Sequence, residues 1–169
     1  PVLSLGGAIV SQPDIDVMLY KFSATEVFNG HFLGGSFGVN VNIPLAQANM
    51  KADTFVKDSP FTLKDDQFGL GDTTITPMVG WHHGNLHSTA SLSFYIPTGQ
   101  YSTAVVKPLQ GVYDVLSIGK NKPAIDPSLS LTYLNPQMGV EFSGSLGVTI
   151  NAVNHATDYL SAPELHLEL

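Results

Sequence analysis

The stretch that decides the fold is NLHSTASLSFYIP, residues 85–97. Its apolar side chains fall on even-numbered positions between Leu86 and Ile96, and its odd-numbered positions from His87 to Tyr95 are polar. Successive side chains of a β-strand point to opposite faces, so this alternation predicts a strand with one apolar and one polar face.

The same alternation recurs along the chain. Five further segments show it: residues 36–45, 73–82, 128–134, 139–151 and 164–169. Weaker strands are expected at residues 2–10 and 17–23, which brings the total to about eight.

A tight turn is expected between the segments that flank residues 83–84. If His83-Gly84 is a two-residue turn, Trp81 lies opposite Leu86, and apolar meets apolar as the register of a two-faced sheet requires. Glycine tolerates the positive φ of such a turn.

A second tight turn is expected at residues 135–138, with proline in its second position. It places Tyr133 opposite Val140, so the faces agree again. The other connections are longer and carry most of the lysines and aspartates. These loops are expected at the opposite end of the strands, over residues 46–70, 98–126 and 152–162.

The kind of polar residue favours a membrane wall over a water-facing sheet. Charged residues make up 12% of the chain, about half the share usual in soluble domains. The polar faces carry mainly Ser, Thr, Asn and Gly, whereas a solvated sheet surface carries Lys, Glu and Arg. Apolar faces of about 9–13 residues match the length of a tilted spanning strand.

Composition also excludes several classes of protein. The chain has no cysteine, so disulfides and thiolate chemistry are excluded. Its net charge is −7 and it contains no arginine, which disfavours nucleic-acid binding. No apolar run approaches the ~20 residues of a transmembrane helix.

These observations predict an all-β, antiparallel up-and-down transmembrane β-barrel, with residues 1–169 as a single domain. The alternative is a soluble β-sandwich or lipocalin-like binding module. That alternative would bury one set of apolar side chains against each other: Phe37, Val41, Leu92, Phe94 and Phe142.

From Phe68 onward the chain resembles the meta-pathway phenol-degradation family of outer-membrane proteins. The matching motifs are GLGD (69–72), Pro77, GWH (80–82), GNLH (84–87), YIPTGQY (95–101), DP (126–127), LTYL (131–134) and NAVNHATDY (151–159). The resemblance implies a channel in the bacterial outer membrane that takes up small hydrophobic or aromatic compounds passively. It also implies a larger barrel, of about 12 strands, of which this chain is one part, incomplete at the C-terminus.

The expected partners are outer-membrane lipid, lipopolysaccharide and a small hydrophobic solute, with no nucleic acid, no cofactor and no catalytic role. Trp81 and Tyr133 are expected at the membrane interface, where aromatic side chains gather. Seven residues are candidates for the lumen or the pore mouth: His82, His87, Tyr95, Glu141, Asn154, His155 and Asp158.

Two chemical alternatives use the histidines. His82 and His87 share the polar face and are expected to lie diagonally, but zinc normally needs three or four ligands, so no metal site is expected. An outer-membrane lipid hydrolase would use His87 or His155 as its base. The sequence lacks the G-x-S-x-G nucleophile elbow that would favour it.

Overall fold

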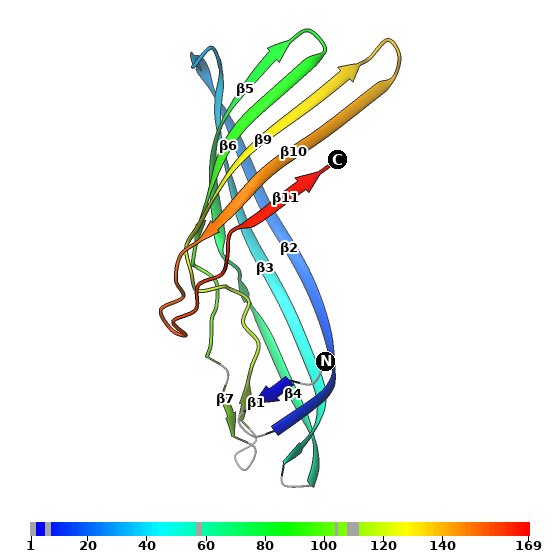
Figure 1. Ribbon diagram of the computed structural model, residues 1–169, viewed down its shortest axis with the longest axis vertical. Coiled ribbons are helices and arrows are strands. Elements are labelled where there is room, and N and C mark those ends of the chain that lie inside the picture. The colour runs from blue at the N-terminus through cyan, green and yellow to red at the C-terminus, as the bar shows by residue number, and fades with distance from the viewer. Residues whose placement is uncertain (1–2, 6–7, 57–58, 104, 108–111) are drawn as a thin grey trace. The chain divides into compact units, whose positions relative to one another are not determined.

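A computed structural model describes residues 3–5, 8–56, 59–103, 105–107 and 112–169, and this part of the chain is all-β (Figure 1). Within it, no helix is long and apolar enough to cross a membrane. The predicted fold class, an antiparallel up-and-down sheet of the kind that forms barrel walls, is confirmed.

Eleven strands are described. In chain order they are β1 (Leu3–Leu5), β2 (Ala8–Phe32), β3 (Gly35–Val56), β4 (Ser59–Leu70), β5 (Thr73–His83), β6 (Leu86–Ile96), β7 (Val105–Lys107), β8 (Val112–Asp114), β9 (Ala124–Asn135), β10 (Val140–Asn151) and β11 (Glu164–Glu168). About eight strands were predicted, and eight of the described ones have five residues or more, but β4 is not among those predicted.

The chain divides into two compact units. The first comprises residues 1–21, 44–72 and 98–121, and the second comprises residues 22–43, 73–97 and 122–169. Strands β2 and β3 run from one unit into the other, and the single-domain assignment stays a prediction.

The second unit is an antiparallel sheet in the order β2-β3-β5-β6-β9-β10-β11. Its register places apolar residues opposite apolar residues and polar residues opposite polar residues. Apolar Leu129 of β9 lies opposite Ala90 of β6 and Leu146 of β10, while Ser130 lies opposite Thr89 and Ser145. The two faces expected from the alternation are therefore continuous across neighbouring strands.

The predicted turn at residues 83–84 is displaced by one residue. The turn is Gly84-Asn85, so His83 lies opposite Leu86 and Trp81 lies opposite Ser88. Gly84 has φ +60° at the first turn position, as in a type II′ turn. This moves the register by two residues. Each side chain stays on its predicted face, because side chains of a strand repeat their direction every two residues.

The second predicted turn is displaced in the same way. Asn135 pairs with Val140, and the loop is residues 136–139. The Asn135 side-chain oxygen accepts the backbone N–H groups of Gln137 and Met138, both at 3.1 Å, and Gly139 has φ +64°. This Asx-type turn, with the left-handed glycine after it, starts later than a proline-led β-turn would.

The predictions at the start of the chain and over residues 46–70 were wrong. Residues 8–32 form the single long strand β2 in place of two short ones, and residues 46–70 form a hairpin of β3 and β4 in place of a loop. Acidic and basic residues on that hairpin masked the strand pattern.

The first unit contains this β3–β4 hairpin and most of the buried apolar side chains among the described residues. Leu63 is fully buried, and Ala46, Ala48 and Ala52 are also buried. Two aspartates hold the long connection 98–121 against the hairpin. Asp65 Oδ2 accepts the backbone N–H groups of Val115 and Leu116, at 2.7 and 2.8 Å.

Asp72 makes the second attachment. Its Oδ1 accepts the N–H of Gly99 at 3.0 Å and its Oδ2 accepts that of Lys120 at 2.7 Å. A Cβ on Gly99 would lie 2.5 Å from the Cα of Gly119, so the two chain segments can pass this closely only as glycines. Asp72 itself lies in the two-residue junction between β4, which ends at Leu70, and β5, which begins at Thr73.

Candidate functional site

A row of polar side chains crosses every strand of the second unit on one face of its sheet. We call it the polar belt, and its members are Ser23, Asn40, Thr76, Ser93, Asp126, Thr149 and His166. Alternation places each of them on the face opposite the apolar side chains.

The β2, β3, β5 and β6 members of the polar belt are joined by hydrogen bonds and by register. Asn40 Nδ2 donates to Ser23 Oγ at 3.0 Å, and Asn40 lies opposite Thr76. Thr76 Oγ1 donates to Ser93 Oγ at 2.9 Å, and Ser93 lies opposite Asp126. Hydroxyl and amide groups therefore continue from strand to strand up to the carboxylate.

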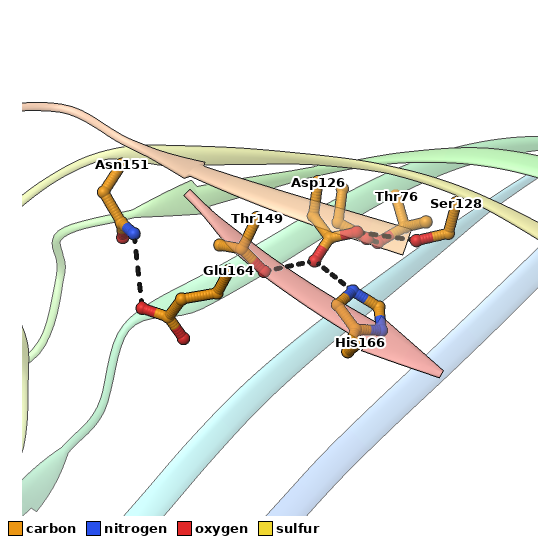
Figure 2. Close-up of polar contacts among 8 residues, drawn as sticks. Thr76, Asp126, Ser128, Thr149, Asn151, Glu164 and His166 are labelled. Atoms are coloured by element: carbon orange, nitrogen blue, oxygen red, sulfur yellow. Dashed lines mark hydrogen bonds and ion pairs between the residues drawn. The ribbon is translucent and has the colours of Figure 1, made fainter. Parts of the chain in front are cut away.

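Asp126 is the centre of the β9, β10 and β11 part, which Figure 2 shows. Its side chain accepts hydrogen bonds from Ser128 Oγ and Thr149 Oγ1, both at 2.6 Å, and lies 2.9 Å from His166 Nε2. Asp126 is only 4% exposed. Hydrogen bonds of this kind are what a buried carboxylate requires.

The approach of His166 to Asp126 depends on Gly147 of the intervening strand β10. A Cβ at Gly147 would collide with the His166 ring and with Ser128 Oγ. Next to this group, Asn151 Nδ2 donates to Glu164 Oε1 at 3.5 Å, a second side-chain link between β10 and β11 (Figure 2).

At the tight-turn end of the polar face, His82 and His87 lie directly opposite one another rather than diagonally as predicted. Their Nδ1 atoms are 2.8 Å apart. Two other predicted residues share the polar face by alternation. Tyr95, between Thr74 and Ala124, is half-buried, and Glu141 is exposed and accepts a hydrogen bond from Ser143 Oγ at 3.1 Å.

The remaining candidates lie in the connection between β10 and β11. Asn154 is buried, its Oδ1 accepts the N–H of Ala156 at 3.0 Å, and its backbone pairs with Tyr159. His155 and Asp158 are exposed on this loop, and Asp158 has φ +53°. Asn154 therefore orders the loop, while His155 and Asp158 are its accessible polar groups.

Lys122 fastens the same loop to the start of β9. Its ammonium group donates to Ser161 Oγ and lies 5.9 Å from the centre of the Tyr159 ring. Lys122 is buried, so a hydroxyl and an aromatic face surround its charge.

Both predicted interface aromatics lie near the tight turns. Trp81 Nε1 donates to the Leu33 carbonyl at 3.0 Å, and Tyr133 is exposed opposite Leu86. An aromatic cluster that the sequence reasoning missed lies on β2 and β3. Phe37 stacks on Phe28 with ring centres 5.6 Å apart and meets Phe32 edge-on at 6.0 Å.

The sequence reasoning did not single out Asp126 or His166 as site residues. Asp126 was assigned to a loop, yet it has the same parity as Ser128, Ser130 and Thr132 and could have been read as the first polar residue of that strand. Nothing local distinguishes His166 from a surface residue, because its partner lies on a strand two places away.

The residues that approach one another do not form a hydrolytic triad. Ser128 donates to Asp126 rather than to a histidine, and the ring nitrogen near His87 belongs to His82. The polar belt offers many neutral hydrogen-bonding groups and one buried carboxylate, Asp126, whose oxygens already have hydrogen-bond partners within the protein. Such a surface can make weak contacts with a solute along a path.

Comparison with known proteins identifies the family of the chain. No curated protein and no solved structure matches the chain. A family model described as "Putative MetA-pathway of phenol degradation" matches residues 1–169. Its match covers the whole chain, so the protein belongs to this phenol-degradation family.

Proposed function

We propose that this chain forms wall strands of an outer-membrane β-barrel through which small hydrophobic or aromatic molecules pass without energy input. In this proposal the polar belt faces the lumen and the apolar face of the second unit contacts lipid. In this proposal the chain is part of a passive channel, it catalyses no reaction, and it uses no cofactor.

The observation that carries the proposal is the exposure of the apolar face. Leu129, Phe142 and Leu165 are 64%, 71% and 73% exposed. They lie on the apolar faces of β9, β10 and β11, where apolar and polar residues alternate regularly. An exposed, continuous apolar surface marks an interaction with another apolar phase. Lipid tails fit a surface that extends over several neighbouring strands.

The same side chains argue against the soluble sandwich. That fold would bury Phe94 and Phe142 against each other, yet both are exposed. Phe37 instead contacts Phe28 and Phe32 of the neighbouring strand. A sandwich core would need a second sheet over this face.

Connection lengths orient the proposed barrel. Outer-membrane barrels have short periplasmic turns and long extracellular loops. By this rule Gly84-Asn85 and residues 136–139 face the periplasm, and the connections 98–121 and 152–163 face outward. In this proposal lipopolysaccharide is the neighbour of the outward-facing connections.

The proposed mechanism follows from the chemistry of the polar belt. Conduction requires contacts that are favourable enough for entry and weak enough for release. Hydroxyl and amide groups provide such contacts for a phenol-like solute, which has one polar group and an apolar ring. Asp126 is already satisfied by three partners, so it would not trap a cation.

Liposome flux tests this proposal with a matched pair of variants. The full-length protein should require detergent for extraction, migrate differently in gels before and after heating, and admit phenol into liposomes faster than protein-free controls. Ser130→Trp on the polar face should lower the flux, and Leu129→Trp on the apolar face should leave it unchanged.

Three results would overturn the proposal. They are solubility without detergent, no flux from a heat-modifiable protein, or equal loss of flux in both variants. Turnover of phospholipid or ester by the purified protein, lost in His87→Ala or His155→Ala, would instead establish a hydrolase.

A further inference from the structure

The β5–β6 hairpin brings two imidazole rings together on the polar face. His82 and His87 are cross-strand partners, their ring centres are 4.3 Å apart, and their Nδ1 atoms are 2.8 Å apart. His83, the neighbour of His82, points to the opposite face because side chains alternate along a strand.

The close approach follows from the length of the turn. Gly84-Asn85 is a two-residue turn, so His83 and Leu86 close it as a hydrogen-bonded pair. His82 and His87 are then the next pair, which is non-hydrogen-bonded and has the shorter distance between Cα atoms, about 4.5 Å. The backbone register therefore places the two rings next to each other.

We propose that His82 and His87 form a two-point binding site for a divalent copper ion, coordinated through the two Nδ1 atoms. Metal–nitrogen bonds of about 2.0 Å to two nitrogens 2.8 Å apart give an angle close to 90°. Neighbouring positions of a square-planar or tetragonal copper site have this angle. Tetrahedral zinc would need the nitrogens about 3.3 Å apart.

The surroundings suit a hydrated cation. His82 is exposed and His87 is half-buried, so water can fill the remaining coordination positions. His87 lies opposite Thr132, which contacts Ser143, and Ser143 in turn donates to the Glu141 carboxylate. With a net charge of −7 the chain attracts cations in general.

Coordination also has a simple proton balance. At 2.8 Å one Nδ1 carries a hydrogen and the other accepts it. Binding moves that proton to Nε2 of the same ring, which leaves both imidazoles neutral, and each Nδ1 lone pair then forms one bond to copper. No electron is transferred. The site is independent of the proposed channel function.

Copper titration of the folded, full-length protein tests the site. Wild type should bind one Cu²⁺ ion with an electron paramagnetic resonance spectrum that shows two nitrogen ligands. Loss of an outer-shell partner alone typically weakens a metal site about 10–100-fold, so His82→Ala and His87→Ala should each raise the Kd at least that much.

His83→Ala is the matched control, because it removes a histidine from the same hairpin but from the other face. It should keep the wild-type affinity and spectrum. The circular dichroism of each variant should match that of wild type, and His87→Asn repeats the test if His87→Ala does not fold. Equal weakening by His83→Ala, or a wild-type spectrum with one nitrogen ligand or none, would overturn the proposal.

Discussion

The imidazole Nε2 of His166 lies 2.9 Å from the carboxylate Oδ2 of Asp126, 40 positions earlier in the chain. The two residues belong to β11 and β9, and the contact passes over Gly147 of β10. The last described strand is thus held by a side-chain bond to a strand that is not its neighbour, in addition to its ladder with β10.

Replacing Asp126 by Ala should destabilise the protein. The change leaves Ser128, Thr149 and His166 without their shared acceptor, and hydrogen bonds to a charged group contribute about 1.5–3 kcal/mol each. We expect the midpoint of urea unfolding in detergent to fall and the β10–β11 amides to exchange faster. Asp66→Ala, at an exposed position, is the control and should change neither quantity.

The two-faced wall could be predicted from the sequence because its evidence is local. Alternation from Leu86 to Ile96 depends only on residues two apart, and it stayed correct when both turns proved to be displaced. The turns were harder to place, since Gly84 can be either the first or the second residue of a tight turn.

The β3–β4 hairpin was missed for a physical reason. Its alternation includes Lys51, Asp53 and Lys64, charges that usually indicate a loop, and its stability comes from partners outside the segment. Leu63 is fully buried, and Asp65 binds backbone groups about 50 positions later. The Asp126–His166 contact was missed for the same reason, because a contact across strands leaves no periodic signal.

The orientation of the wall can be tested with two neighbouring residues of β9. Leu129→Lys places a charge on the proposed lipid face and should lower folding stability in bilayers by about 2–4 kcal/mol if it lies near the midplane. Ser130→Lys, on the polar face, should change it by less than about 1 kcal/mol. Folding titrations into lipid vesicles measure both, and a larger loss for Ser130→Lys would reverse the assignment of the faces.

The attachment of the 98–121 connection depends on Asp65. Asp65→Ala removes the acceptor of two backbone N–H groups, so the amides of Val115 and Leu116 should exchange about tenfold faster or more, the factor that 1.4 kcal/mol represents. Hydrogen exchange followed by mass spectrometry detects this change. Asp66→Ala serves for comparison, because Asp66 is exposed. Similar exchange in both variants would mean that other contacts hold the connection.

The turn between β2 and β3 contains a residue in an unfavourable conformation. Leu33 has φ +52° and is followed by Gly34 at +76°, as in a type I′ turn. Asn adopts left-handed φ more readily than Leu, so Leu33→Asn should stabilise the protein by about 0.5–1 kcal/mol. The Trp81 hydrogen bond goes to the Leu33 carbonyl and is retained.

Thermal unfolding in detergent measures the gain from this substitution. Leu160 is also exposed, but its φ is not left-handed, so Leu160→Asn should bring no gain. A lower unfolding temperature for Leu33→Asn would indicate that the Leu33 side chain contributes more than its conformation costs.

The pairing of Leu129 with Ala90 and Leu146, and of Ser130 with Thr89 and Ser145, restricts how such a wall can change its length. Deleting one residue within β9 would move every following side chain of that strand to the opposite face, so that leucines would lie among hydroxyl groups. Viable insertions and deletions in the strands should therefore come in twos, and odd-numbered ones should accumulate where strands are joined.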